Sequence, residues 1–393
     1  MSFLENLLDG VSVEWIPLSE VVSTITAPVK LNKNTYGEIG KIPVIDQGVT
    51  FIAGYTDQDF AKVEDGEYVI FGDHSEHIKY VDFPFIQGAD GLKILKSKVD
   101  NTKFIYYALS NFYRRENNYK RHWSSAKGTL IPIPCPDNPT RSIEIQQKIV
   151  GILDSFMDLT AELKAELKAR KKQYIYYREN LYSFDKNNVK HLPLDDESIG
   201  VFQRGKRFVK TDLISEGVPT IHYGEMYTHY GTWADETISF VSKKLVNDKN
   251  LRLAQKGDVV IVAAGETIED IGKGTAWLGN DGVVIHDACF SYKTSLNPKF
   301  VAYFTRTKQF HDQIKKYISS GKISAINARG LGKAKIPVPS KEEQEQIVSI
   351  LDKFDTLTTS ITEGLPKEIE LRQKQYEYYR DLLLAFPIDN LEL

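Results

Sequence analysis

One heptapeptide occurs twice in this chain, almost letter for letter. Lys172-Gln-Tyr-Ile-Tyr-Tyr-Arg178 returns as Lys374-Gln-Tyr-Glu-Tyr-Tyr-Arg380, each time near the end of a stretch with helical periodicity. An internal repeat at about half-chain distance indicates a duplicated architecture, because each copy has to provide a similar structural unit. The duplication therefore constrains the fold before any local element is considered.

Further pairs of segments keep the same order in both halves. Ile149-Val-Gly-Ile-Leu-Asp154 matches Ile347-Val-Ser-Ile-Leu-Asp352, and Lys103-Phe-Ile105 matches Lys299-Phe-Val301. The remaining anchors are Ile16-Pro17-Leu18 with Leu192-Pro193-Leu194, Ile42-Pro43 with Val218-Pro219, Gly48 with Gly224, Gly66 with Gly257, and Ile131-Pro-Ile-Pro134 with Ile336-Pro-Val-Pro339. Because the halves differ between these anchors, we expect one scaffold that carries two different surfaces.

Length, hydropathy and cysteine usage restrict the class of protein. A chain of 393 residues with 41% hydrophobic residues can bury more than one core. It has no apolar run of about 18 residues, and its N-terminus lacks the order of a signal peptide, so we expect no membrane association. The two cysteines, Cys135 and Cys289, occupy non-equivalent positions. This argues against a disulfide or a metal site and favours a cytoplasmic protein.

Positive charge is concentrated at the same place in both copies, although the formal net charge is −3. Residues 101–130 contain six Lys or Arg against one Glu, and residues 299–335 contain nine against one Asp. Basic segments that recur in both copies are typical of a protein with a polyanion partner, and we favour a nucleic acid. A solvated helix face is the alternative interpretation of each run.

Each half is predicted to contain a domain of mixed strands and helices. Short apolar or alternating runs bounded by Gly and Asp indicate strands at 41–45, 68–71, 91–95, 259–262 and 282–285. Aromatic-rich stretches with helical spacing follow at 104–113 and 300–317. The predicted fold class is therefore α+β, with two duplicated α/β-type domains.

A long helical stretch completes each copy. Apolar residues recur every three or four positions from Ile149 to Leu181, and the stretch from Ile347 to Leu383 repeats this stripe. The segment Gly364–Pro366 predicts a break in the second stretch, because proline cannot continue the preceding hydrogen-bond ladder. An antiparallel, coiled-coil-like pair within the chain would bury both stripes. Two separate dimerising coiled coils are the alternative.

Motifs for catalysis or metal binding are not recognisable in the sequence. Gly272-Lys-Gly-Thr275 lacks the upstream glycine and the residue order of a phosphate loop. The polar run Asp73–His77 has no second-half counterpart or cysteine to complete a zinc site. We find no nucleophile elbow, no His-Glu-x-x-His and no Asn-Pro-Pro-aromatic motif. We therefore predict no catalytic residue, no metal ligand and no enzyme activity in this polypeptide.

Candidate nucleic-acid contacts lie in the basic segments and in the turns that differ between the halves. Lys and Arg neutralise phosphates, and Ser and Asn reach phosphates or base edges. The aromatic residue of each basic segment, Trp123 or Tyr317, could instead belong to the core at a helix end. In the first half the predicted contacts are Asp73, His74, Ser75, Arg114, Lys120, Arg121, Trp123, Ser124 and Lys127. In the second half they are His222, Tyr223, Glu266, Thr267, Lys273, Lys316, Ser319, Ser320, Lys322, Asn327 and Arg329.

One segment of the second half has no counterpart in the first. The stretch between Lys322 and Ile336 is longer than the stretch between Lys127 and Ile131, and it includes Asn327. The contacts predicted in this segment are therefore specific to the second domain.

Together these features resemble the specificity subunit of type I restriction-modification systems. The resemblance spans the whole chain. It is carried by both helical regions and by Asn6-Leu-Leu-Asp-Gly-Val11, Ile131-Pro-Ile-Pro-Cys-Pro-Asp-Asn-Pro139, Ile350-Leu-Asp-Lys-Phe-Asp-Thr-Leu357 and Ile361-Thr-Glu-Gly-Leu-Pro-Lys-Glu-Ile369. Within that family the chain looks like the branch with a Thr-Ala-Glu-Leu helical repeat, here Thr160-Ala-Glu-Leu163 and the variant Lys164-Ala-Glu-Leu167.

The resemblance implies a non-catalytic subunit with a defined place in a complex. Each target-recognition domain would read one half of a bipartite, asymmetric site in double-stranded DNA. The helices would set the spacer and dock two modification (methyltransferase) subunits, and restriction (translocase and nuclease) subunits would join them. S-adenosylmethionine, ATP and Mg would be bound by these partners, and this chain would bind no cofactor directly.

The family organisation also implies domain bounds and a docking region. The first target-recognition domain is expected at 1–141 and the central helix at 142–186. The second domain is expected at 187–340, and the C-terminal helix at 341–393, with its break near Gly364–Pro366. Partner docking and helix pairing are assigned to Tyr174, Tyr177, Arg178, Tyr376, Tyr379 and Arg380.

The short helical repeat has a simple physical interpretation. One additional four-residue copy lengthens a helix by about 6 Å, and DNA rises by roughly 3.4 Å per base pair, so the spacer should change by one or two base pairs. A coiled-coil adaptor that binds only proteins is the alternative function. Such an adaptor would show no salt-dependent affinity for DNA.

Overall fold

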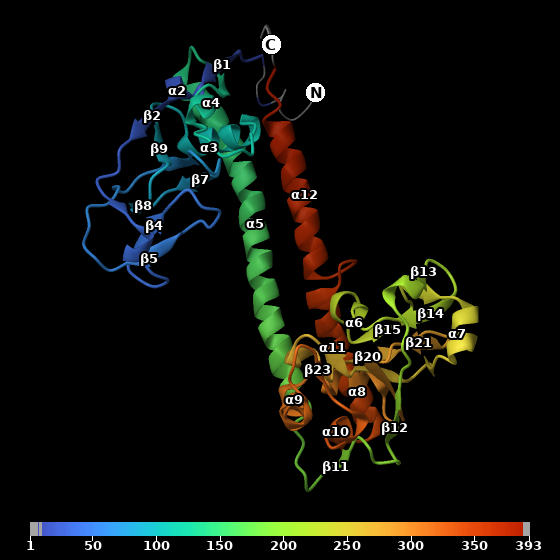
Figure 1. The fold of residues 1–393 in the computed structure, drawn as a ribbon. Helices are drawn as coiled ribbons and strands as arrows, with labels where there is room; N and C mark the ends of the chain where they lie inside the picture. Colours follow the sequence, from blue (N-terminus) through green and yellow to red (C-terminus); the bar gives the residue numbers. More distant parts are fainter. Residues whose placement is uncertain (1–6, 8–9, 388–393) are drawn as a thin grey trace. The chain divides into compact units, whose positions relative to one another are not determined.

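The computed structural model describes residues 7 and 10–387, apart from the side chain of Tyr227. The chain divides into two compact units (Figure 1): unit 1 is Met1–Leu163 with Ile369–Leu393, and unit 2 is Lys164–Glu368. Each unit therefore combines residues from both halves of the sequence. Asn6, Leu8 and Asp9, half of one segment that carries the family resemblance, lie outside the described residues.

Unit 1 contains two four-stranded sheets and a two-stranded one. Its strands are β1 (Val13–Pro17), β2 (Val22–Ile25), β3 (Lys30–Leu31), β4 (Ile42–Ile45), β5 (Gly54–Thr56), β6 (Tyr68–Gly72), β7 (Ile78–Val81), β8 (Ile86–Gly88), β9 (Leu92–Ser97) and β10 (Leu130–Pro134). The sheet orders are β2-β9-β6-β7, β3-β8-β4-β5 and β1-β10. Strand β6 is buried along its whole length, which explains its continuous apolar sequence.

Unit 2 contains two five-stranded sheets and two strand pairs. Its strands are β11 (Lys190–Pro193), β12 (Gly200–Arg204), β13 (Leu213–Ile214), β14 (Val218–Ile221), β15 (Trp233–Ala234), β16 (Ser239–Val241), β17 (Leu253–Ala254), β18 (Val259–Val262), β19 (Ala264–Gly265), β20 (Gly274–Trp277), β21 (Val283–Ile285), β22 (Cys289–Thr294), β23 (Ser324–Ala325) and β24 (Lys335–Val338). The sheet orders are β12-β22-β18-β20-β15, β13-β16-β14-β21-β17, β11-β24 and β19-β23.

The strand partners correspond between the two units. Strand β6 lies between β9 and β7, as β18 lies between β22 and β20, and all four pairings are antiparallel. Strand β4 pairs in parallel with β8, as β14 pairs with β21. The pair β1–β10 corresponds to β11–β24. This topology confirms the predicted α+β class with two duplicated domains.

Short helices complete the two units. Those of unit 1 are α2 (Leu18–Val21), α3 (Thr102–Phe112) and α4 (Trp123–Ala126), and those of unit 2 are α6 (Glu225–Thr228), α7 (Lys243–Lys249), α8 (Pro298–Phe304), α9 (Lys308–Ile314) and α10 (Ala328–Gly332). Single 3-10 turns lie at Lys33–Thr35, Lys210–Asp212, Ile268–Asp270 and Lys315–Tyr317. The five predicted strands correspond to β4, β6, β9, β18 and β21, and the helix predicted at 104–113 is α3.

The single helix predicted for 300–317 is wrong, because the structure divides it into α8, α9 and a 3-10 turn. Tertiary hydrogen bonds hold the residues at the break. The Thr305 hydroxyl accepts from Gly274 N at 2.9 Å, and the Thr307 hydroxyl caps the new helix by accepting from Phe310 N at 3.2 Å. These side chains favour an end and a fresh start over a continuous helix.

Long helices contribute to both units. Helix α5 (Pro139–Asn180) runs for 42 residues and contains the short Thr160–Leu167 repeat. Helix α11 (Lys341–Thr359) ends before α12 (Leu365–Leu383) begins, and Gly364 between them has a φ of 81°. A positive φ of this size favours glycine, which is why the chain turns at this residue.

The repeated heptapeptides pack on the long helix of the other sequence half. In unit 1 the ring of Tyr379 stacks on Phe156 with centroids 5.0 Å apart, and in unit 2 Tyr177 stacks on Phe354 at 5.3 Å. Long helices thus pair within the chain, as the apolar stripes predict. The core of unit 1 accordingly contains Leu153 of α5 together with Leu383 of α12.

Candidate nucleic-acid interface

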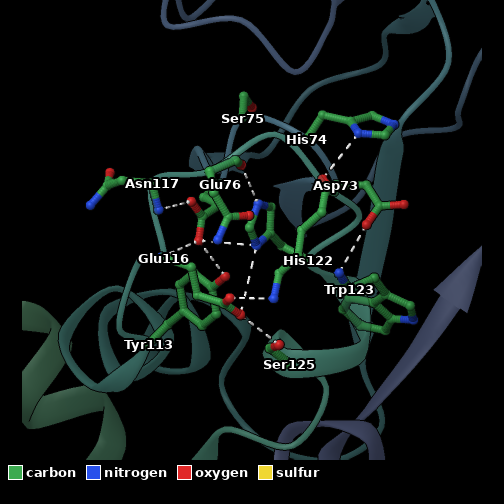
Figure 2. A network of polar contacts seen from close by, with 12 residues as sticks. Asp73, His74, Ser75, Glu76, Tyr113, Glu116, Asn117, His122, Trp123 and Ser125 are labelled. Atoms are coloured by element: carbon green, nitrogen blue, oxygen red, sulfur yellow. Dashed lines mark hydrogen bonds and ion pairs between the residues drawn. The ribbon is translucent and has the colours of Figure 1, made fainter.

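In unit 1 the structure brings together the turn after β6 and the basic segment, two stretches that are distant in sequence. Asp73 is buried, and its carboxylate accepts a hydrogen bond from Trp123 N at 2.8 Å. The ring of His74 donates from Nδ1 to Lys120 O at 3.1 Å and stacks on the ring of Tyr119. The turn that carries these predicted contacts therefore holds the basic segment in place (Figure 2).

Glu76 is the centre of this attachment, as Figure 2 shows. Its buried carboxylate accepts from Tyr113 Oη at 2.7 Å, Glu116 N at 2.7 Å and Asn117 N at 2.8 Å. Burial by itself would raise the pKa of Glu76, but these hydrogen bonds outweigh it and lower the pKa below its usual value. An ionised, fully bonded carboxylate thus fixes both backbone and side chain of the segment that begins at residue 113.

His122 closes the same network from inside. Its side chain is completely buried, with Nε2 at 2.8 Å from Asn118 O and Nδ1 at 3.4 Å from the Glu76 carboxylate. The exposed carboxylate of Glu116 accepts from the hydroxyl of Ser125 and pairs with Lys120. These two partners, Lys120 first, lower the pKa of Glu116 to about 2. The segment between residues 113 and 125 is therefore an ordered loop that is held by its own hydrogen bonds and ion pairs.

The cations of this loop face solvent. Exposed side chains follow one another along the segment, namely Arg114, Arg115, Tyr119, Lys120, Arg121, Ser124 and Lys127. Trp123 packs against the core instead, with its ring 6.0 Å from that of Phe71. Ser75, also predicted as a contact, donates to Gln47 O and is half-buried. Of the first-half candidates, the basic residues and Ser124 are those available to a large ligand.

Unit 2 joins the corresponding stretches by backbone pairing. Strand β19, directly after the central strand, pairs with β23 in the basic segment. Ile326 N donates to Ala263 O at 2.8 Å, and Ser319 both pairs with Ala325 and donates its hydroxyl to Ala325 O. The same two regions are therefore connected in both units, by carboxylates in unit 1 and by strands in unit 2.

Some of the predicted contacts of unit 2 are exposed to solvent, and some have side chains that already interact within the protein. Exposed side chains are Glu266, Thr267, Lys316, Ser319, Ser320, Lys322, Asn327 and Arg329. The side chain of Asn327 caps α10 by accepting from Gly330 N at 2.8 Å, and Lys273 pairs with Asp270 at 2.6 Å. The ammonium groups of Lys316 and Lys333 lie 5.0 and 4.6 Å from the centre of the Tyr317 ring.

His222, Tyr223 and Glu266 line a common pocket of about 520 Å³ in unit 2. The rings of His222 and Tyr223 are 4.6 Å apart. The three residues come from the turn after β14 and the turn after β18, so the fold brings together two of the loops that the sequence singled out.

A duplicated contact that the sequence analysis missed attaches each domain to a long helix. In unit 1 the Asp154 carboxylate accepts from Lys103 Nζ at 2.8 Å and from Tyr107 Oη at 2.6 Å. In unit 2 the equivalent bonds run from Lys299 at 2.8 Å and Tyr303 at 2.7 Å to Asp352. The Lys and the Asp both lie in repeated segments, so two charged residues kept at equivalent positions were the available signal.

A second duplicated bond supports the first. The side-chain oxygen of Gln146, which is completely buried, accepts from Asn101 N at 2.8 Å, and that of Gln344 accepts from Asn297 N at 2.9 Å. Each asparagine also caps the helix that follows, α3 or α8. We call the Lys–Asp and Tyr–Asp contacts, the Gln–Asn bond and the Asn cap of each unit the helix mount.

Comparison with known proteins places the chain in a family. The type I restriction modification DNA specificity domain matches residues 12–170 and 197–371. The type I restriction enzyme EcoR124I/EcoR124II specificity subunit of Escherichia coli is 38% identical over 409 residues, covering 98% of each chain.

The chain belongs to the type I restriction-modification specificity family.

Other relatives agree with this membership. A putative type I restriction enzyme specificity subunit of Haemophilus influenzae, S.HindORF215P, is 32% identical over 98% of both chains. A solved type I S subunit from M. genitalium shares 16% identity and a TM-score of 0.54, covering 97% of this chain and 98% of that one. A chain from a type I R-M system structure has a TM-score of 0.59 at 16% identity, covering 95% and 97%. These two structures support the fold.

The docking residues predicted for this family member are divided between the helix pair and the surface. Tyr174 is buried, and Arg178 is largely buried with its guanidinium 5.4 Å from the Tyr174 ring. The side chains of Tyr177, Tyr376 and Tyr379 pack on neighbouring residues but remain partly exposed to solvent. Arg380 pairs with Asp381. The neighbouring Tyr176 and Tyr378, at equivalent places in the heptapeptides, are 63% and 64% exposed.

No group of three His, Cys, Asp or Glu side chains suited to a metal ion occurs among residues 7 and 10–387. Within the same described part, no helix is both long and apolar enough to cross a bilayer.

Proposed function

We propose that the chain is the DNA-recognition subunit of a type I restriction-modification complex and that each of its domains reads one half of a bipartite, asymmetric site. The single observation that carries the proposal is the connection, in both units, of a divergent turn with an exposed basic segment. Cations on such a segment neutralise phosphates and fix register, and the residues beside them differ between the units. One scaffold can therefore recognise two different half-site sequences.

In this proposal the predicted contacts have different roles. Arg114, Lys120, Arg121, Lys127 and Lys322 neutralise phosphates, because they are exposed and not built into the core. Buried Asp73 and capping Asn327 position the segments. Base readout then falls to other exposed polar residues, such as Ser124, Ser320, Glu266 and Arg329. Of these, Glu266 and Arg329 lie in stretches that differ between the units.

The long helices supply spacing and docking in the same proposal. The short repeat Thr160–Leu167 lies inside the continuous helix α5, so an added copy would lengthen it by about 6 Å. This interpretation assigns the chain to the family branch with the Thr-Ala-Glu-Leu repeat. Two modification subunits would dock on exposed tyrosines of the heptapeptides, for which Tyr176 and Tyr378 are the best candidates because solvent-exposed aromatics favour interfaces.

Catalysis is assigned to the partners. Modification subunits would bind S-adenosylmethionine and methylate adenine, and restriction subunits would use ATP and Mg to translocate and cut. The described residues of this chain offer binding groups and structural networks, so its role is recognition. Because its DNA partner would be the host chromosome and incoming DNA, we assign it to the cytoplasm.

Mapping of N6-methyladenine in the genome of a host that expresses this chain with its modification subunit tests the proposal. We expect a bipartite motif with two different half-sites and a fixed spacer, which disappears when this gene alone is deleted. Absence of any such motif in a methylation-competent host would contradict the proposal. A coiled-coil adaptor without DNA specificity would give that result.

A further inference from the structure

The pocket of unit 2 lies where the variable turns meet. Its walls come from the segment after β12, the turn after β14, the turn after β18 and the turn between β21 and β22. The lining residues include Arg207, Lys210, His222, Tyr223, Glu266 and His286. At about 520 Å³ it is within the range of small-ligand sites and large enough for one nucleotide.

Unit 1 closes the equivalent space with side chains. There the turn after β4 bonds to the turn after β6: His74 N donates to Gln47 Oε1 at 3.1 Å, and the hydroxyl of Ser75 donates to Gln47 O. The site is so crowded that a Cβ on Gly91 would lie 2.8 Å from Gln47 and 3.0 Å from His74. In unit 2 strand β19, Ala264–Gly265, follows the central strand, and both of its residues line the open pocket together with Glu266.

Aromatic rings form the interior of the pocket. The ring of His286 lies 5.0 Å from Phe208, 4.9 Å from His222 and 5.1 Å from Tyr223. Phe208 is fully buried and supports the two histidines from behind, whereas His222 and Tyr223 are half-exposed. Flat surfaces of this kind stack on nucleobases with little dependence on base identity.

Hydrogen bonds orient both histidine rings, and His286 Nδ1 also lies 3.0 Å from the carboxylate of Asp287. His286 Nε2 donates to Phe208 O at 3.0 Å, and its Nδ1 accepts from Ala288 N at 3.1 Å. His222 Nδ1 accepts from Gly224 N at 3.3 Å, so its Nε2 carries the proton. Burial lowers the pKa of both rings. Glu225 near His222 and Asp287 near His286 oppose this shift only in part.

Positive charge surrounds the opening. Arg204, Arg207 and Lys210 line the pocket and are exposed, against the carboxylates of Glu266 and Asp287. Arg204 is partly engaged, since its Nε donates to Asp287 O at 3.0 Å. Arg207 and Lys210 are thus the residues best suited to bind a phosphate at the rim.

We propose that this pocket binds a single nucleotide, with the base against the rings of His222 and Tyr223 and the phosphate at Arg207 and Lys210. The ligand is either a nucleotide of bound DNA that has left the base stack or a free mononucleotide. A base inside an intact duplex is stacked between its neighbours and cannot offer its face to these rings, so the DNA form requires unstacking. That form rests on the proposed function, and the free form does not.

Two measurements distinguish the sources. In the first, the full chain is titrated with AMP, GMP, CMP and TMP by calorimetry. In the second, the complex with modification subunits is mixed with its cognate duplex carrying 2-aminopurine at successive positions of the second half-site. A rise in fluorescence at one position reports unstacking. Binding in the first measurement supports a free nucleotide, and a fluorescence rise in the second supports a nucleotide of DNA.

Variants assign either signal to the pocket. Arg207→Glu and His222→Ala should each reduce it about tenfold, equivalent to about 1.4 kcal/mol. Lys244→Glu, on exposed α7 away from the pocket lining, makes the same charge change as Arg207→Glu and should leave the signal unaltered. If His222→Ala is poorly folded by circular dichroism, the surface substitution Arg207→Glu decides alone.

The negative results separate this inference from the proposed function. If the wild-type complex binds duplex DNA specifically but neither measurement gives a signal, the pocket proposal is overturned and the DNA-recognition role is retained. A signal that survives Arg207→Glu unchanged also overturns the pocket proposal. If the wild-type complex does not bind duplex DNA at all, the recognition role fails, and the mononucleotide titration still decides the pocket.

Discussion

The two units use the same strands but hold their basic segments by different chemistry. In unit 1 the buried carboxylates of Asp73 and Glu76 bind the segment through its N–H groups. In unit 2 strand β19, Ala264–Gly265, pairs with β23 through its backbone. The helix mount, by contrast, uses the same residue types with the same partners in both units. The turns and basic segments, which differ between the units, are therefore structurally separate from the helix mount, which is the same in both.

This division explains how one scaffold can carry two specificities. The sheets and the mount fix where the turns and basic segments lie, and the turns then determine how the surface is shaped. Unit 1 closes its surface around Gln47, and unit 2 leaves a pocket. A change in either turn should alter one reading surface without disturbing the other, and this can be tested.

Removal of the Glu76 carboxylate should have the largest effect. Glu76→Ala leaves Tyr113 Oη and two backbone N–H groups without their buried acceptor. The free energy of local unfolding of this segment should therefore fall by about 3 kcal/mol. Hydrogen exchange should show loss of protection at residues 113–123 and none at 315–325. The control Glu266→Ala makes the same substitution at an exposed residue of unit 2 and should change neither region. Equal loss in both units would contradict the separate attachment of the two segments.

The helix mount should respond alike in the two units. Asp154→Asn and Asp352→Asn each weaken one ion pair with Lys and one hydrogen bond from Tyr, both partly exposed. We therefore expect each variant to lower the free energy of unfolding of its unit by about 2 kcal/mol. Hydrogen exchange in α3 should rise for the first variant and in α8 for the second, by similar factors. A strong effect in one unit and none in the other would show that the mount is not equivalent.

Reversal of a single exposed cation should have a smaller effect that is independent of sequence. Arg121→Glu in unit 1 or Lys322→Glu in unit 2 should weaken DNA binding by the complex by about 1 kcal/mol and lower the salt slope by about one. Affinity measured over a range of salt concentrations checks this. Unchanged affinity in both variants would exclude these residues from the DNA-binding face.

Acidification should have the smallest effect, a loss of stability in the basic segment of unit 1. Because the folded-state pKa of Glu76 is lowered, its contribution to stability is present above the unfolded value of about 4.5 and is lost as the pH falls through the folded value. Protection of residues 113–123 should therefore decrease on acidification, and Glu76→Gln should remove much of this dependence. An unchanged pH profile in Glu76→Gln would exclude Glu76 as its source.

Much of the architecture could be predicted because it is repeated in the sequence. The order of Ile-Pro, Gly and Lys-Phe anchors gave the duplicated topology, and apolar periodicity gave the helix pair. The role of Glu76 could not be predicted, because it depends on contacts with residues 113–117 that only the tertiary fold creates. The helix break at Thr305 likewise depends on Gly274, a residue far away in sequence.

The candidate site was predictable in its location more than in the roles of its residues. Paired basic segments and divergent turns were visible as charge and as mismatch between the halves. Asp73 was chosen as a surface contact but is buried as an acceptor for Trp123 N, because polarity alone does not distinguish a ligand contact from an internal one. The turns that line the pocket beside His222 are marked as divergent in the sequence, but their meeting in one pocket depends on the tertiary fold.

The most direct test of a shared scaffold with independent readers is a domain exchange followed by methylation mapping. In the hybrid, residues 13–134 replace residues 190–338, so that the strand pair β1–β10 takes the place of β11–β24. Expressed with its modification subunit, the hybrid should methylate a motif in which the first half-site occurs twice and the second is lost. A hybrid that methylates DNA but retains the wild-type second half-site would contradict the account.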